Sequence, residues 1–167
     1  KVTLANGENF YSETVIWTAG VKANPIAGLP PDSLGGAQRI KVNEYNLIEG
    51  TQDIFAIGDV AVQITEENPR GLPMLAPVAM QQGKQLAQNL LRKARGEKLQ
   101  PFKFKDKGVM ATIGRNKAVV DLPKVKFQGT FAWFVWMFVH LLSLVGFRNK
   151  LVTIIGWTQN YFNYDRP

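Results

Sequence analysis

The sequence contains no cysteine and only one histidine, His140, among its 167 residues. Without cysteine, these residues can form no disulfide, no thiolate metal site and no cysteine nucleophile. One histidine is too few for a zinc site built from protein ligands, so we expect no metal site. The pattern Gly-x-Gly-x-x-Gly, which forms the phosphate-binding turn of dinucleotide-binding domains, does not occur either.

Acidic residues are scarce in the second half of the chain. Residues 84–167 carry 15 basic and 4 acidic side chains, whereas residues 1–83 carry 5 basic and 9 acidic side chains. This imbalance favours an anionic partner for the second half, either nucleic acid or an anionic lipid surface. The aromatic and uncharged character of the same half favours lipid, so we expect no nucleic acid partner.

The first 60 residues favour strands and loops. Residues 2–4 followed by Asn6-Gly7 predict a hairpin, and a chain that opens inside a hairpin without Met or a signal peptide is expected to be a fragment. Residues 14–18 are an apolar, β-branched run that predicts a strand covered on both faces. Residues 54–57 predict a second short buried strand, which Gly58-Asp59 ends.

The middle of the chain changes from a helical pattern to short strands. Residues 73–96 predict a helix with Pro77 in its first turn and Gly96 at its end. Residues 97–107 form a basic linker, and residues 108–127 predict a three-stranded meander.

A long uncharged segment dominates the C-terminal region. Residues 127–147 carry no formal charge, and as one helix they would be about 30 Å long, enough to cross a bilayer core. Residues 151–164 predict an amphipathic helix. Interfacial helices, a transmembrane span, and a soluble core or oligomer interface are the three interpretations. Gly146 and the polar residues after it favour a helical hairpin that lies on the membrane surface.

Residues 51–59, Thr-Gln-Asp-Ile-Phe-Ala-Ile-Gly-Asp, carry the clearest chemical signal. A buried strand that ends in Gly-Asp delivers a carboxylate to the edge of the sheet where α/β proteins bind ligands. Gly58 allows a ligand to approach the backbone, and Asp59 can accept hydrogen bonds from ligand hydroxyls. The alternative is that Asp59 only caps a turn, but the full pattern favours a ligand site.

This pattern resembles the second FAD-contact motif of flavoprotein reductases that contain two dinucleotide-binding domains. In those proteins the aspartate meets the ribityl chain, so the resemblance assigns Asp59 to FAD. Residues 14–20 are similar to the strand that returns the chain from the NADH domain to the FAD domain. Residues 75–83 resemble the motif Ala-Gln-x-Ala-x-Gln, which lies beside flavin and quinone in this superfamily. Pro77 stands where the first Gln is usual, so no side-chain hydrogen bond to quinone is expected there.

Two later segments narrow the resemblance to type II NADH dehydrogenases, the NADH:quinone oxidoreductases. Residues 108–121 resemble the first strands of their small C-terminal domain, and residues 136–149 are similar to their membrane-anchoring C-terminus. The resemblance implies that the chain is a C-terminal fragment of an enzyme that passes electrons from NADH through FAD to a membrane quinone, without pumping protons.

The implied fold is an α/β fold, an incomplete portion of a flavoprotein with two dinucleotide-binding domains. A small β-meander and C-terminal membrane-associated helices complete it. Residues 1–20 would end the NADH-binding domain and supply the return strand, and residues 21–96 would be the C-terminal part of the FAD-binding domain. Residues 97–128 would be the basic linker and meander, and residues 129–167 the membrane-associating helices.

The expected site residues fall into three sets, and no catalytic residue is assigned. The expected cofactor contacts are Gly58, Asp59, Ala76, Pro77 and Val78. The quinone candidates are Val78, Gln81 and Trp136, and the membrane contacts are Trp133, Trp136, Phe138, Arg148, Lys150 and Trp157. Gln81 has the alternative of being one of several solvated helix glutamines. His140 is either a proton donor on the quinone side or an ordinary core or interfacial histidine.

The resemblance places the parent enzyme peripherally on the cytoplasmic face of a bacterial inner membrane, against an anionic lipid surface. A sulfide:quinone oxidoreductase, another quinone-reducing flavoprotein, is disfavoured because its chemistry needs cysteine. The other alternative is a non-catalytic membrane-binding or oligomerisation module. Because the phosphate-binding turns are missing, the isolated fragment is expected to bind FAD weakly or not at all and to be inactive. Its apolar surfaces should drive self-association, and a homodimer is one form of this.

Overall fold

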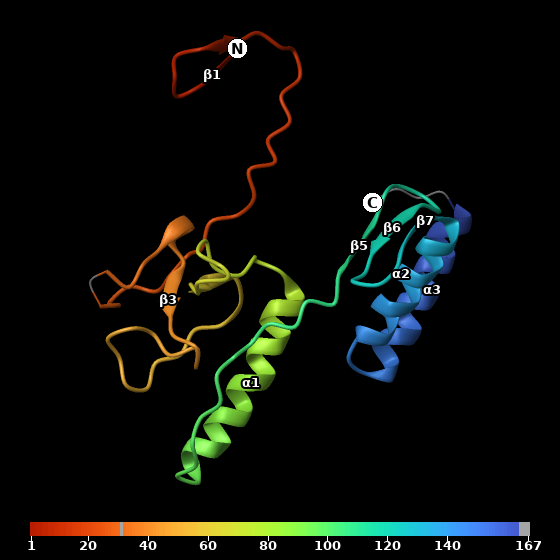
Figure 1. Ribbon diagram of the computed structural model, residues 1–167. Helices are drawn as coiled ribbons and strands as arrows, with labels where there is room; N and C mark the ends of the chain where they lie inside the picture. Colours follow the sequence, from red (N-terminus) through yellow and green to blue (C-terminus); the bar gives the residue numbers. More distant parts are fainter. Residues whose placement is uncertain (31, 164–167) are drawn as a thin grey trace. The chain divides into compact units, whose positions relative to one another are not determined.

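The computed structural model describes residues 1–30 and 32–163, in two compact units (Figure 1). The first unit comprises Lys1–Phe104 and the second Lys105–Pro167. Residues 164–167, the end of the expected C-terminal segment, lie outside the described residues. Each unit has its own core, and each is described by itself below.

The chain opens with a small hairpin, as predicted. Strand β1 (Val2–Thr3) pairs antiparallel with β2 (Asn9–Phe10), and Gly7 in the turn has a φ of +87°. The strand predicted over residues 14–18 was wrong, because that segment forms no strand and pairs with no other described segment. Ile16 and Trp17 are 81% and 83% exposed, so this apolar run has no partner here. A strand needs a neighbour for its backbone hydrogen bonds, and composition alone supplies none.

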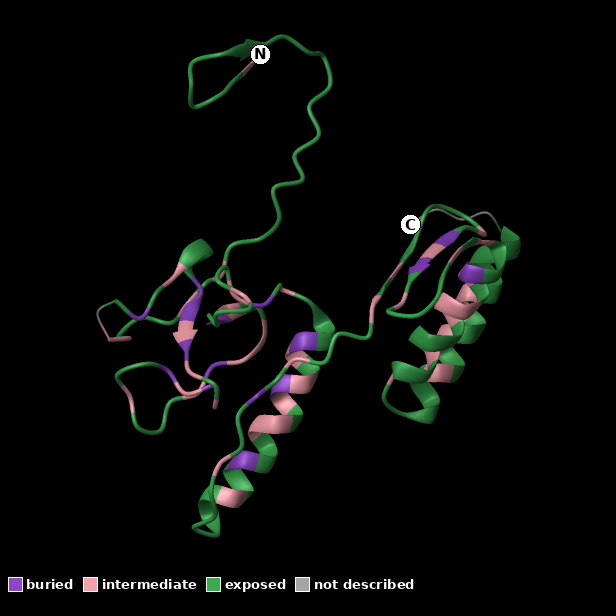
Figure 2. Ribbon diagram, in the orientation of Figure 1, coloured by how far each residue is buried: buried purple, intermediate pink, exposed green. Residues whose placement is uncertain are grey.

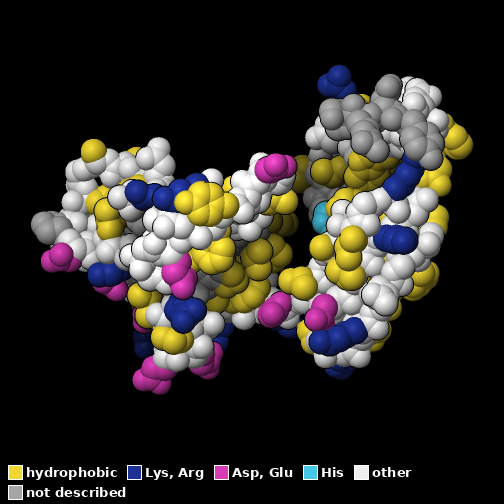
Figure 3. Space-filling view, turned by 90° about the horizontal axis from the view of Figure 1, so that it is seen from above, with side chains coloured by type: hydrophobic (Ala, Val, Ile, Leu, Met, Phe, Trp, Pro, Cys, Tyr) yellow, Lys and Arg dark blue, Asp and Glu magenta, His cyan; other side chains and the backbone are white. Residues whose placement is uncertain are grey.

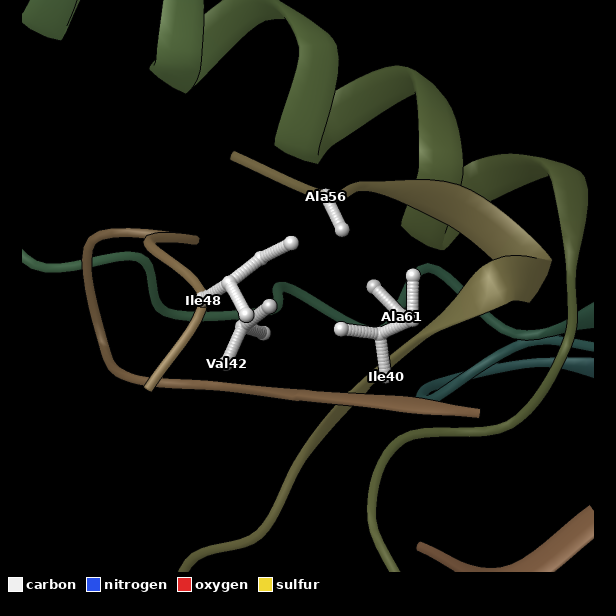
Figure 4. Packing of buried hydrophobic residues seen from close by; sticks show 5 residues of the cluster. All are labelled: Ile40, Val42, Ile48, Ala56 and Ala61. Atoms are coloured by element: carbon white, nitrogen blue, oxygen red, sulfur yellow. The ribbon is translucent and has the colours of Figure 1, made fainter. Parts of the chain in front are cut away.

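The core of the first unit forms around one pair of parallel strands, β3 (Ile40–Val42) and β4 (Ala61–Gln63). A one-turn 3-10 helix, η1 (Gly36–Gln38), precedes β3. Figure 4 shows the buried cluster, in which side chains from both strands meet those of the connection between them. Its members are Ile40, Val42, Ile48, Ala56 and Ala61.

The short strand predicted over residues 54–57 was only partly correct. Ala56 is buried, but Ile54 is exposed, and the segment pairs only through an isolated antiparallel bridge between Leu47 and Phe55. Gly58 does not end a strand. It starts a 3-10 helix, η2 (Gly58–Val60), and β4 follows directly. The hydrophobic pattern indicated burial correctly, but pairing depended on residues distant in sequence.

Helix α1 (Ala76–Ala94) confirms the predicted helix, including Pro77 in the first turn and Gly96 just after the end with a φ of +70°. Its buried stripe consists of Val78, Gln82 and Asn89, spaced by four and seven residues. Figure 2 shows these buried positions on one side of the helix, where the following segment runs back along it. The Asn89 side chain holds that segment, since it donates to the carbonyl of Gln100 and accepts from its amide.

The second unit begins with the three-stranded antiparallel meander that the sequence predicts. Its strands are β5 (Val109–Thr112), β6 (Ala118–Asp121) and β7 (Lys126–Gly129), in that order across the sheet. The alternate residues Ala118 and Val120 of the central strand point to one face and pack on Ala132 of the following helix.

The uncharged segment is divided among several elements rather than forming one helix. Helix α2 (Thr130–Ser143) follows β7 directly, and α3 (Phe147–Asn163) follows Gly146, whose φ is +87°. The two helices contact each other, so the predicted helical hairpin is confirmed. Within residues 1–30 and 32–163, no helix combines the length and apolar character needed to cross a membrane.

Gly108 offers a test of the second unit's fold. Its φ is +87°, and an added Cβ would collide with the backbone carbonyl of Asp121 on the neighbouring strand. Gly108→Ala should therefore lower the free energy of unfolding by about 2–4 kcal/mol, from backbone strain and overpacking together. Urea unfolding followed by circular dichroism measures this.

Gly114→Ala is the matched control. Gly114 has a similar φ of +70°, but nothing lies within 4 Å of an added Cβ. We expect a loss of only about 1 kcal/mol there, from the left-handed backbone alone. Equal losses in the two variants would show that the close approach of Gly108 to β6 is wrong.

Candidate functional site

The Gly58-Asp59 turn packs directly on helix α1. The backbone amide of Gly58 donates a hydrogen bond to Oε1 of Gln82, with a donor–acceptor distance of 2.8 Å. Gln82 is 2% exposed, so this bond is shielded from water. Gly58 has a φ of +73°, and an added Cβ would lie 3.4 Å from the Cβ of Ala79. Glycine therefore allows both the turn's conformation and its close contact with the helix.

A buried arginine holds the other end of the same turn. Arg39, immediately before β3, is 7% exposed. Its guanidinium donates to the carbonyl of Ala61, the residue after η2, and to that of Leu72, 2.8 Å away. Burial lowers the pKa of Arg39 from its ordinary value, and the negative charge of Asp59 partly offsets this. One side chain thus connects β3, β4 and the loop that precedes α1.

Asp59 is the exposed member of this arrangement. Among the described residues its carboxylate has no hydrogen bond or ion pair, although it lies near enough to Arg39 to influence it electrostatically. Its oxygens are therefore available to hydroxyl groups of a ligand. An exposed carboxylate beside a glycine turn suits a ligand that carries hydroxyl groups.

The other expected cofactor residues lie at the start of α1. Ala76 and Pro77 are exposed in the first turn, and no side chain caps this end of the helix. The side chain of Val78 is 3% exposed and packs in a second cluster with Leu72 and Phe102. Val78 can therefore present its backbone, but not its side chain, to a ligand in this arrangement.

The quinone candidates lie in both units. Val78 and Gln81 lie on α1 in the first unit, where Gln81 is half-buried, and Trp136 lies on α2 in the second unit. His140, one turn after Trp136, stacks on its ring with centroids 4.1 Å apart. The Nδ1 atom of His140 lies 2.8 Å from the Trp136 carbonyl oxygen, so this side chain is partly engaged within its own helix.

A large apolar groove occupies the second unit, between the β5–β6 turn, α2 and α3. It has a volume of about 800 Å³, which is within the range of small-molecule sites in proteins. Four of the six predicted membrane contacts line it together: Trp133, Trp136, Phe138 and Trp157. Arg115 lies at its polar end, with its guanidinium 4.6 Å from the centroid of the Tyr161 ring.

The outer faces of α2 and α3 are also apolar. Large hydrophobic side chains that are at least 40% exposed and do not line the groove include Phe131, Val139, Leu142, Phe147, Leu151, Val152 and Ile155. Figure 3 shows one face of the molecule, on which hydrophobic side chains lie at the surface among lysines and arginines. The two helices contain only two formal charges, those of Arg148 and Lys150, and both are positive. Both residues lie in the first turns of α3, outside the groove.

The described part of the chain contains no group of three histidine, aspartate or glutamate side chains able to hold a metal ion.

Comparison with known families agrees with this division of the chain. Residues 1–83 match the family model for pyridine nucleotide-disulphide oxidoreductases, which defines the class of the first unit. Residues 107–163 match the NDH2 C-terminal domain, which covers most of the second unit. The two matches, together with the curated relatives described next, support the assignment of this chain to the type II NADH dehydrogenases.

Curated relatives occur in bacteria and in mitochondria. The chain is 33% identical to the type II NADH:quinone oxidoreductase Ndh of Mycobacterium tuberculosis, over 90% of this chain and 33% of that relative. It is also 33% identical to the mitochondrial internal alternative NAD(P)H-ubiquinone oxidoreductase A1 of Arabidopsis thaliana, over 96% of this chain and 35% of that relative. The chain therefore spans about a third of the length of the curated relatives it matches.

A solved structure shares the fold. NDH2 from Plasmodium falciparum in complex with NADH aligns with a TM-score of 0.66 at 18% identity, over 78% of this chain and 40% of that chain. At this identity the likeness supports the α/β fold and no more.

Sequence reasoning missed the two buried polar residues that hold the Gly58-Asp59 turn, Arg39 and Gln82. Neither residue occupies a defining position of a sequence motif that indicates a site. Gln82 lies four residues after Val78 and seven before Asn89, which is helical spacing. The sequence therefore indicates this buried stripe only if polar residues are counted as possible buried positions. No local signal marks Arg39.

Proposed function

We propose that this chain is the C-terminal part of a flavoprotein that transfers electrons from NADH to a membrane quinone without pumping protons. The observation that carries the proposal is the exposed Asp59 carboxylate, which a buried helix glutamine holds in place through the Gly58 amide. This geometry supports binding of the ribityl chain of FAD. The curated relatives named above are NADH or NAD(P)H quinone oxidoreductases, which agrees with this assignment.

Under this proposal the chain's residues bind and orient FAD from one side. Asp59 accepts hydrogen bonds from ribityl hydroxyls, and Gly58 permits the close approach. Ala76, Pro77 and the backbone of Val78 lie along the flavin edge, with the positive end of the α1 dipole directed toward it. When bound, FAD would supply the redox chemistry, accepting a hydride from NADH and releasing two electrons to the quinone. Gln81 is the polar contact for the quinone.

The second unit would attach the enzyme to lipid. Its exposed aromatic and aliphatic side chains suit the hydrocarbon boundary, and Arg148 and Lys150 suit anionic lipid phosphates. The groove that contains Trp136 and Trp157 would receive an apolar chain, such as a lipid acyl chain or a quinone tail. We place the enzyme peripherally on the cytoplasmic face of a bacterial inner membrane, with a homodimer as one form of assembly.

Two alternatives remain as outcomes of experiment. A non-catalytic membrane-binding or oligomerisation module would bind vesicles through the same apolar helices but would retain no flavin. Another quinone-reducing flavoprotein would retain flavin but would not oxidise NADH. The absence of cysteine disfavours sulfide oxidation.

The flavin assignment is tested with the full-length protein that contains this chain. Asp59→Asn should reduce FAD affinity roughly tenfold, because a charged acceptor of hydrogen bonds is replaced by a neutral one. FAD content and NADH oxidation with a soluble quinone are the measurements. Residues 1–167 alone should retain little FAD.

Asp53→Asn is the matched control, since Asp53 belongs to the same motif and is exposed like Asp59, but its carboxylate pairs with Lys93 at the surface. It should leave both FAD content and NADH oxidation close to wild type. A full-length protein that purifies without flavin, or that fails to oxidise NADH, would contradict the proposal.

The lipid assignment predicts a charge-dependent affinity for vesicles. Replacing Arg148 and Lys150 together by Gln should weaken binding to vesicles rich in anionic lipid roughly thirtyfold, at about 1 kcal/mol per basic residue. Co-sedimentation at a fixed salt concentration measures this. Replacing the exposed Lys98 and Lys103 of the first unit by Gln makes the same change in net charge and should have a smaller effect. Equal losses in both pairs would mean that no particular surface faces the lipid.

A further inference from the structure

We propose that Arg39 and Gln82 are positioning residues that hold the Gly58-Asp59 turn at its two ends, so that Asp59 is presented to the ribityl chain in one fixed geometry. The inference rests on the proposed function, because it assigns to these two residues the positioning of a proposed flavin contact. Neither residue was expected to belong to a site from its position in the sequence.

Three consecutive hydrogen bonds define the turn. The Gly58 amide donates to Gln82, the Ala61 amide donates to the Gly58 carbonyl, and the Ala61 carbonyl accepts from Arg39. The two side chains therefore anchor the backbone one residue before and two residues after Asp59. Between these anchors the backbone has little freedom, so the direction of the Asp59 carboxylate is set by groups that are themselves buried.

The helix side of the arrangement is buried. Gln82 is 2% exposed and lies on the buried stripe of α1, so its Oε1 has no access to water as an alternative partner. Without that acceptor, the Gly58 amide would lose its partner in a half-buried position. Gln82 also joins the turn to the same helix whose first residues, Ala76 and Pro77, lie at the proposed flavin edge. The bond thus sets the position of two parts of the proposed site relative to each other.

On the sheet side the turn is held by Arg39, and a gain in stability does not explain why this side chain is buried. Burying a guanidinium carries a desolvation penalty, and a buried charge is often no more stabilising than a hydrophobic residue of similar size. The Nε atom of Arg39 is buried without a hydrogen-bond partner among the described residues, which adds to this penalty. Arg39 instead contributes in two ways. Its guanidinium joins the Ala61 and Leu72 carbonyls, which fixes the geometry of the turn, and it carries a fixed positive charge near Asp59.

The full-length protein tests this with matched buried amides on one helix. Gln82→Met removes the acceptor for Gly58 but keeps a side chain of similar length, and Asn89→Leu removes a buried amide from the same face of α1, two turns away. Both variants should lose thermal stability. Only Gln82→Met should weaken FAD binding, roughly threefold to tenfold, and shift the flavin midpoint potential.

Arg39 is tested by two substitutions. Arg39→Met should weaken FAD binding by a similar or larger factor, and Arg39→Lys should restore part of it because one donor and the charge remain. If Arg39→Met does not fold, the Arg39→Lys and Gln82→Met variants still decide the question. Amide hydrogen exchange at Gly58 should be faster in Gln82→Met and unchanged in Asn89→Leu.

The outcomes distinguish a failure of the positioning roles of Gln82 and Arg39 from a failure of the proposed flavin site. If Asn89→Leu weakens FAD binding as much as Gln82→Met does, Gln82 has only a structural role and the inference is overturned. It is also overturned if Asp59→Asn weakens FAD binding while the Gln82 and Arg39 variants do not. If Asp59→Asn itself retains FAD at wild-type affinity, the proposed flavin site fails. Exchange at Gly58 then still shows whether Gln82 holds the turn.

Discussion

The hydrogen bond from the Gly58 amide to Oε1 of Gln82 is the contact on which the arrangement of the first unit depends. It joins a three-residue turn to a long helix through a buried acceptor and a half-buried amide, so breaking it would leave a polar group unpaired at a cost of about 1–3 kcal/mol. Arg39 supplies the corresponding contact on the sheet side. Asp59 can remain exposed and still be well placed, because the backbone on each side of it is held by a buried side chain.

The two units differ in the kinds of side chain that they bury and expose. The first has a small aliphatic core and uses buried polar side chains, Arg39, Gln82 and Asn89, to connect segments that lack regular pairing. The second packs a meander against one side of α2 and leaves the outer faces of α2 and α3 apolar, and the only formal charges within these two helices are positive and lie at the start of α3. Such a division suits the proposed function, in which one unit orients a soluble cofactor and the other meets lipid.

Local signals in the sequence predicted the elements that depend on local interactions. Asn6-Gly7 predicted the hairpin, Pro77 and Gly96 predicted the ends of α1, and the meander predicted over residues 108–127 occupies Val109–Gly129. Residues 14–18 were predicted as a strand because their composition suits one, but strand formation needs a distant partner. The Gly58-Asp59 motif was recognised from its residues, whereas its setting before β4 and its two anchors were not. Those anchors are long-range polar contacts, 22 and 24 residues apart in sequence, which no periodicity reveals.

Under the proposed function, this chain completes a flavin site that accepts electrons from NADH and delivers them to a quinone. Anaerobic absorbance spectroscopy of the full-length protein tests it most directly. NADH should bleach the flavin band near-stoichiometrically, and a quinone added afterwards should restore it, with both steps weakened when Asp59 is replaced by Asn. A protein without a flavin band, or a band that NADH does not bleach, would contradict the account.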